Sequence, residues 1–175
     1  MNCKDQMWHP VGARAPRVDG EDKVTGRALF GADLTFDNML WGRPVRTQYP
    51  HAGIVSIDKS KAEAMPGVVR VLTAEDVPGS RTFGVVVPHQ PVLCPDRVRF
   101  MGDAVALVLA ESREAAQAAA RAVRVEYEEL PAIFDPEEAI RPGSPQLHDE
   151  YPGNIAAHHV VRQGDGEQGV AQADV

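Results

Sequence analysis

The sequence predicts an α+β domain built around a mixed β-sheet, and three observations lead to that class. Residues 104–110 (AVALVLA) are apolar throughout, which is typical of a central strand covered on both faces. Residues 113–123 are rich in alanine and follow Ser112, which is suited to cap a helix. Residues 123–130 alternate apolar and charged side chains, as a strand with one solvated face does. Strand, helix and strand in succession predict a β-α-β unit with a right-handed crossover.

Shorter elements are expected before this unit. Residues 53–58 alternate like a strand, and residues 68–73 are rich in β-branched side chains. Between them, Ser60 is expected to cap a short helix over residues 60–65, which the following Pro66–Gly67 pair ends.

Three further segments complete the prediction. Residues 38–50 mix large apolar and basic side chains, as a strand with one wet face would. Thr73, with Asp76 three residues later, predicts a capped turn. Residues 130–140 predict a short helix with an acidic cap, beginning after Pro136.

The same patterns predict the domain organisation. Residues 1–35 carry glycines and prolines with little periodicity, which indicates an extended lead-in to a domain over residues 1–140. Residues 141–154 have the composition of a linker. The remainder begins like a strand and then a helix, without a compact closing element. We therefore expect residues 141–175 to be a linker and the start of a following domain, in a chain cut from a longer one.

Composition excludes several classes of function. The chain has 175 residues, is 43% hydrophobic and carries a formal charge of -7, so it suits one acidic globular domain. Nucleic acid is not an expected partner, because the 18 Lys and Arg are scattered rather than gathered on a basic face. The N-terminus has no signal-peptide core and residues 104–110 are too short to span a membrane, so we expect a cytoplasmic protein with no membrane partner.

The two cysteines, Cys3 and Cys94, do not indicate a metal site. Zinc and iron–sulfur sites need several thiolates, usually in close pairs, and neither cysteine has such a neighbour. A disulfide between the two is possible, but buried or inert thiols are the favoured interpretation.

The stretch RVDGEDKVTGRALFGAD (residues 17–33) could be an ion or phosphate loop or a structural connection. Calcium loops alternate oxygen ligands between two helices, and here the alternation fails and flanking helices are not expected. The phosphate-loop motif is absent from the stretch. We favour turns at Asp19–Gly20 and Thr25–Gly26, where glycine can adopt positive φ, with the acidic side chains facing solvent.

GDGEQG (residues 164–169) matches the G-x-G-x-x-G pattern of dinucleotide-binding loops. That site also needs an acidic residue about twenty positions later, but only six residues follow Gly169. A flexible turn is the favoured interpretation.

The remaining polar residues do not form a catalytic pattern. His158 and His159 are adjacent, so on a strand they would point to opposite faces. Glu126 and Glu128 share a strand face that alternation places in solvent, where a carboxylate is a poor acid catalyst. Glu129 belongs to the same acidic run. Four histidines are isolated in sequence and are expected to be surface or packing residues: His9, His51, His89 and His148. From the residues alone we assign no catalytic, cofactor-binding or metal-binding residue.

Four blocks in fixed order nevertheless resemble a known family. They are residues 17–33, 55–79 (VSIDKSKAEAMPGVVRVLTAEDVPG), 91–112 (PVLCPDRVRFMGDAVALVLAES) and 123–140 (VRVEYEELPAIFDPEEAI). Together they resemble the N-terminal α/β hammerhead domain of the molybdenum hydroxylase large subunit, the family of xanthine dehydrogenase and aldehyde oxidase. The resemblance extends from about residue 11 to the end and implies an α/β hammerhead fold.

The resemblance also implies where the chemistry takes place. In this family the molybdenum, its molybdopterin cofactor (expected in the cytosine dinucleotide form) and the catalytic glutamate belong to later domains. The [2Fe-2S] clusters and FAD belong to other domains or subunits, which are the expected partners. The parent is therefore expected to be an oxidoreductase that hydroxylates purines, aldehydes or N-heterocycles. The sequence of the four blocks resembles xanthine dehydrogenase-like members most. The segment itself is expected to be inactive alone, and to support domain packing and the substrate funnel.

One segment, residues 83–94, occupies the position where related enzymes have a loop bordering the substrate funnel. We hypothesise that Val86, Val87, Pro88 and His89 help line that approach, while an ordinary strand and turn is the competing interpretation. Asp103 departs from the glutamine that many members carry there. The alternative function is a stand-alone binding or scaffold protein that reuses the fold.

Overall fold

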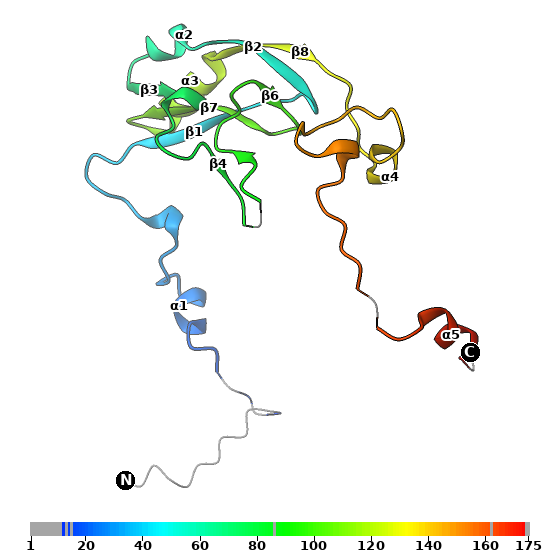
Figure 1. Ribbon diagram of the computed structural model, residues 1–175. Coiled ribbons are helices and arrows are strands. Elements are labelled where there is room, and N and C mark those ends of the chain that lie inside the picture. The colour runs from blue at the N-terminus through cyan, green and yellow to red at the C-terminus, as the bar shows by residue number, and fades with distance from the viewer. Residues whose placement is uncertain (1–11, 13, 15, 86, 162, 174–175) are drawn as a thin grey trace, which may run out of the picture. The chain divides into compact units, whose positions relative to one another are not determined.

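The computed structural model describes residues 12, 14, 16–85, 87–161 and 163–173 (Figure 1). These residues divide into two compact units, Met1–Met39 and Leu40–Val175. The first unit contains a short α-helix, α1 (Gly20–Val24), and a 3-10 turn, η1 (Gly31–Asp33), neither of which has a buried residue. The second unit contains the sheets.

The first sheet is centred on β7 (Ala104–Ala110), with β1 (Trp41–Arg46) on one side and β3 (Val68–Leu72) on the other. Both neighbours run antiparallel to β7. This confirms the prediction of a central strand, because a strand with neighbours on both edges and covered faces needs apolar side chains throughout.

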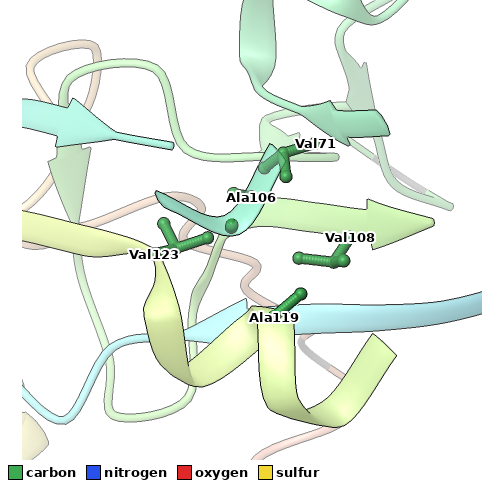
Figure 2. Packing of buried hydrophobic residues seen from close by; sticks show 6 residues of the cluster. Val71, Ala106, Val108, Ala119 and Val123 are labelled. Atoms are coloured by element: carbon green, nitrogen blue, oxygen red, sulfur yellow. The ribbon is translucent and has the colours of Figure 1, made fainter. Parts of the chain in front are cut away.

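Helix α3 (Arg113–Ala122) covers this sheet and packs on β1 and β7. Ser112 caps it as predicted, since its hydroxyl accepts a hydrogen bond from the Ala115 amide at 3.1 Å. Figure 2 shows Val108 of β7 and Ala119 of α3 in the core between the two elements. The small side chains let helix and sheet approach closely. The complete cluster is Ala62, Val71, Ala106, Val108, Ala119 and Val123.

The second sheet has the order β6 (Arg97–Val98), β2 (Ala52–Asp58) and β8 (Arg124–Glu129), again with antiparallel neighbours. Its core cluster consists of Ala52, Cys94, Val98 and Val105. Val45 and Val125 pack against both clusters, so they lie at the seam between the sheets.

The predicted β-α-β unit needs a correction. Strand, helix and strand occur in the expected order, but β7 and β8 belong to different sheets, so α3 does not cross over between strands of one sheet. Alternation predicted which face of β8 is buried, but alternation carries no information about the neighbouring strand. The α+β class and the mixture of short helices and sheets are as predicted.

The cap of the next helix, α2 (Ser60–Glu63), was also predicted wrongly. Ser60 is the first helical residue rather than the cap. The Asp58 carboxylate instead accepts hydrogen bonds from the Ser60 amide at 3.0 Å and hydroxyl at 2.6 Å. These bonds, with that from the Ser60 hydroxyl as the largest cause, lower the pKa of Asp58.

Two predicted caps are confirmed. The Asp76 carboxylate accepts from the Thr73 amide at 2.9 Å, beside η2 (Ala74–Asp76). Asp135 accepts from the Glu137 and Glu138 amides at the start of α4 (Pro136–Ala139). The remaining elements are β4 (Thr82–Phe83), β5 (Gln90–Pro91), η3 (Pro152–Asn154) and α5 (Gly166–Ala171).

The segment after α4 is irregular but makes contacts. The Arg99 side chain donates to the Leu147 carbonyl at 2.8 Å, and Asn154 donates to the Ala139 and Pro145 carbonyls at 2.9 Å each. Residues 155–161 are not a strand, contrary to the prediction for that run. The boundary at residue 140 stays a prediction.

Among the described residues, the helices are all too short or too polar to cross a membrane.

Candidate functional site

The hairpin arm, residues 81–92, contains the residues predicted to border a substrate approach. Strands β4 and β5 pair antiparallel within it, and the Val92 amide donates to the Arg81 carbonyl at 2.9 Å. Figure 1 shows the arm projecting from the two sheets. A side chain at Gly84 would overlap the Val87 carbonyl, so the arm folds back on itself so tightly that only glycine fits.

The described end of the arm exposes apolar side chains. Of the four predicted residues, Val86 lies outside the described residues, and Val87, Pro88 and His89 are exposed. Phe83 is 51% and Val87 41% exposed, and Val85 is fully exposed. Single exposed apolar residues are ordinary, whereas here three of them lie on one projecting arm.

His89 is held in one orientation by its own arm. Its amide and its ring Nδ1 each lie 2.9 Å from the Val87 carbonyl oxygen. A carbonyl oxygen only accepts, so Nδ1 carries the proton, and in the neutral ring Nε2 is left as an acceptor.

The fold brings His89 together with two residues of the segment after α4. Its ring lies edge-on to those of His148 at 5.1 Å and Tyr151 at 6.1 Å between centroids. His148 and Tyr151 are themselves 6.0 Å apart. Sequence reasoning took the histidines as isolated and missed this group, because a contact between residues 89 and 148 leaves no local pattern.

Two small clefts lie beside this aromatic group. One, of about 210 Å³, is lined by the arm together with Arg99, Asp103 and His148. The other, of about 220 Å³, includes Tyr151 and Asn154. Burial, with a smaller effect of the Arg99 charge, lowers the pKa of His148 below its usual value.

Asp103 has a structural role that explains its position. It is buried, and its carboxylate accepts from the Arg99 amide at 2.9 Å, which closes the turn over residues 99–103. Its backbone carbonyl accepts from the Thr47 amide at 3.0 Å, which ties that turn to the end of β1. The turn is the floor of the first cleft.

Cys94 follows the arm in sequence and is buried in the core of the second sheet, as predicted; Cys3 lies outside the described residues. Burial, followed by the nearby Asp103 carboxylate, raises the pKa of the Cys94 thiol to about 12. The thiol is therefore protonated and unsuited to bind a metal as a thiolate.

The stretch 17–33 is structural, but not quite as predicted. Gly26 has a positive φ of 73°, which confirms that turn, whereas Gly20 is the first residue of α1 and has no positive φ. Its acidic side chains are exposed, as predicted, and they also pair with basic neighbours: Asp19 pairs with Arg17 and Lys23, and Arg27 with Glu21 and Asp22. The bonds from Lys23 and then Arg17 lower the pKa of Asp19.

The other candidates are placed as follows. Glu126, Glu128 and Glu129 are exposed on β8, as predicted, and His158 and His159 are exposed outside any strand. His9 lies outside the described residues.

The predictions for residues 164–169 and for His51 need a correction and an addition, respectively. The predicted turn at residues 164–169 is wrong in part, because helix α5 begins at Gly166 and Asp165 caps it by accepting from the Gln168 amide at 3.0 Å. His51 is buried and its Nδ1 donates to the Pro131 carbonyl at 2.7 Å, while in the described part of the chain its Nε2 has no partner.

Side chains that could ligate a metal ion directly do not gather in the described part of the chain. Within the ranges that the structure describes, no three histidine, cysteine, aspartate or glutamate side chains are close enough to hold a metal. The one thiol in these ranges is the protonated Cys94.

Comparison with known proteins identifies the fold. The model of the family "Aldehyde oxidase and xanthine dehydrogenase, a/b hammerhead domain" matches residues 25–131. The chain belongs to this family.

Among curated relatives, this hammerhead chain is 49% identical over 158 residues to a probable xanthine dehydrogenase subunit from Bacillus subtilis, covering 90% of the chain and 21% of the relative. It is 40% identical over 170 residues to the nicotinate dehydrogenase large molybdopterin subunit of Eubacterium barkeri, and this match covers 96% of the chain and 39% of the relative. The chain therefore spans less than half the length of either relative.

The aldehyde oxidoreductase of Desulfovibrio gigas has the same fold, with a TM-score of 0.77 and 34% identity, covering 91% of this chain and 19% of that one. The hammerhead domain is thus one part of molybdenum enzymes in this family, and the antiparallel sheets match that assignment.

Proposed function

We propose that this hammerhead domain is a non-catalytic module of a molybdenum-dependent hydroxylase, and that its hairpin arm borders the path by which substrate reaches a centre elsewhere in the enzyme. The parent would hydroxylate purines, aldehydes or N-heterocycles. It would use molybdopterin, in its cytosine dinucleotide form, with [2Fe-2S] and FAD in other domains or subunits.

The observation that carries this proposal is the apolar end of the arm. Phe83, Val85 and Val87 are exposed on a projection whose fold is fixed by Gly84 and by the paired strands. In a domain that has no partner, apolar side chains exposed on the arm would contribute no stability and would favour aggregation. A neighbouring domain, or the apolar ring of a substrate, would cover them.

His89 adds a polar group to this surface. With Nδ1 donating to Val87, its Nε2 can accept a hydrogen bond from an N–H or O–H of a passing substrate. An apolar wall with one oriented acceptor suits heteroaromatic substrates, which have flat apolar faces and polar edges.

The test uses the complete enzyme. Val87→Asp and His89→Ala are expected to change the ratio of kcat/KM between a purine, an aldehyde and an N-heterocycle by about threefold or more, because each changes one wall of the approach. Val55→Ala, at an exposed valine of β2, is the matched control. Unchanged KM and kcat for every substrate would exclude the arm from the approach.

Metal analysis tests two parts of the proposal separately: that the parent is a molybdenum enzyme, and that this domain does not bind the metal. Stoichiometric molybdenum in the complete enzyme, retained in the arm variants, is the expected result. Molybdenum bound by the isolated 175-residue chain would contradict a non-catalytic role, and a complete protein without molybdenum would contradict the proposed enzyme.

A further inference from the structure

A groove of about 840 Å³ lies along β1 and α3, away from the residues assigned to the substrate approach. Its floor is the seam between the two sheets, formed by Val45 of β1 and by Val125 and Tyr127 of β8. Tyr127 packs on Tyr49 with the ring centroids 5.0 Å apart. The floor is therefore apolar with an aromatic end.

Three arginines line this groove: Arg43, Arg46 and Arg121. Among the residues that the structure describes, no aspartate or glutamate lines it. In the described part of the chain none of the three forms an ion pair, and Arg46 makes one hydrogen bond, to the Gly102 carbonyl at 2.6 Å. Three uncompensated cations around one depression are unusual in a chain with a net charge of -7.

The backbone explains how both β1 arginines reach the groove. In a regular strand, Arg43 and Arg46 would point to opposite faces. The pairing of β1 with β7 shifts register between Val45 and Arg46, and such an irregularity redirects the following side chain. The residues from 43 to 49 consequently line the groove without alternation.

Strand β1 is also an edge strand, because β7 is its one neighbour in the described part of the sheet. An edge strand offers unpaired backbone groups to an extended chain, but Pro44 has no N–H to donate. A partner would therefore be held mainly by guanidinium groups and by the apolar floor, rather than by a long added strand.

We propose that this groove receives an extended acidic segment from the remainder of the parent enzyme. Arg43 and Arg46 lie about 10 Å apart along an extended strand, so a partner with two carboxylates about three residues apart would meet both. Arg121 on α3 faces the same groove from the other wall, and arginine binds carboxylates in a bidentate manner. An apolar residue between the carboxylates would rest on Val45 and Val125.

The volume of the groove favours a polypeptide over a small anion. A single phosphate would occupy a small part of 840 Å³ and would leave the valine and tyrosine floor in solvent. The chain spans 21% and 39% of two curated relatives, so under the proposed function a large part of the enzyme is available to supply the segment. This inference rests on the proposed function for the source of the partner.

The test is site-specific cross-linking in the complete enzyme. A photo-reactive p-benzoylphenylalanine replaces Gln117, an exposed residue of α3 that lines the groove. The expected product joins residue 117 to a segment outside residues 1–175 that carries at least two Asp or Glu within about five positions. A cross-link to a neutral or basic segment, to a second copy of this chain, or no cross-link at all would overturn the proposal.

Charge reversal makes the test specific. Arg43→Glu combined with Arg121→Glu is expected to reduce the cross-link about tenfold, and arginine in place of the captured carboxylates should restore it. Arg113→Glu, at an exposed arginine of the same helix outside the groove, should leave it unchanged. Equal losses in both variants would overturn a role for the groove arginines.

Two measurements distinguish the ways in which the test can fail. Molybdenum content of the unmodified enzyme tests the proposed function and does not depend on the groove. Pyrophosphate serves as a probe for a small-anion site: if it raises the melting temperature of the wild type but not of the Arg43→Glu, Arg121→Glu variant, and no acidic segment is captured, the groove is an anion pocket and the proposal is wrong.

Discussion

The two sheets with α3 and the hairpin arm use apolar residues in opposite ways. In the sheets, valines such as Val71 and Val108 are completely buried between β7, its neighbours and the helix. In the arm, Phe83, Val85 and Val87 face solvent. Burial of each valine in the sheets contributes about 1.5–3 kcal/mol, whereas the arm's exposed valines contribute little until something covers them. The apolar side chains that stabilise the fold and those that stay exposed thus lie in different regions of one domain.

The largest expected loss of stability comes from placing a charge in the core of the first sheet. Val108→Asp places a carboxylate without a partner between β7 and α3, and should lower the free energy of unfolding by about 3 kcal/mol or more. Val69→Asp, at an exposed valine of β3, is the control and should cost less than about 1 kcal/mol. Urea unfolding followed by circular dichroism measures both, and equal losses would contradict the packing described for β7.

Cys94 lies where the arm joins the sheets, because it follows the arm in sequence, its amide donates to the Ala104 carbonyl at 2.8 Å and its thiol is buried in the second core cluster. The pKa of the thiol is raised from 9.0 to about 12, so above about pH 9 the unfolded thiol loses its proton while the folded one keeps it. Stability should therefore fall as pH rises from about 9 to about 12, by up to about 1.4 kcal/mol per pH unit.

Unfolding free energies at about pH 8 and about pH 10, in a Cys3→Ser background, measure this slope. Cys94→Ala removes the ionisable group and is expected to flatten the dependence. An identical slope in the two proteins would show that other groups cause the alkaline loss.

A smaller effect is expected at the start of α3. Ser112→Ala removes the acceptor of the Ala115 amide and should cost about 1 kcal/mol. Ser112→Asp keeps an acceptor at the same position and should retain most of the stability. Thermal unfolding measures the stability of the two variants. If both lose the same stability relative to the wild type, the Ser112 hydroxyl does not act as a cap.

The smallest change in overall stability is expected in the arm. In Gly84→Ala the new methyl group meets the Val87 carbonyl, so the arm should open while the sheets stay intact. Hydrogen exchange at the His89 and Val92 amides is expected to become about tenfold faster, with less than about 0.5 kcal/mol lost in global unfolding.

Gly31→Ala, at a glycine with open space around it, is the matched control. Equal acceleration throughout the sheets would show that the arm and the sheets are one cooperative unit.

The sheets were more predictable from the sequence than the arm, and the reason is physical. A strand with two covered faces must be apolar throughout, and a serine before an alanine-rich run favours a capped helix. The roles of residues 104–110 and Ser112 can therefore be predicted from the local sequence. The assignment of β7 and β8 to different sheets depends on which strand lies beside each, which no local pattern records.

Sites were harder to predict for the same reason. The contact between His89 and His148 and the gathering of Arg43, Arg46 and Arg121 join residues from separate elements. Ser60 was misread as a cap because Asp58, two residues earlier, supplies a better acceptor. Spacing along the chain did suffice for Asp135 and Asp76, where donor and acceptor lie within three residues.

The pairing of β1 with β7 has a consequence for how the arm can diverge. Residues 41–46 meet residues 104–110 only after the intervening chain has closed a long loop, and the arm lies within that loop. The entropy of loop closure grows with the logarithm of length, so doubling such a loop costs only about 0.6 kcal/mol. Residues can be inserted or deleted at the tip of the arm with little penalty to the fold. The same scaffold can therefore carry arms of different lengths while its two sheets stay intact.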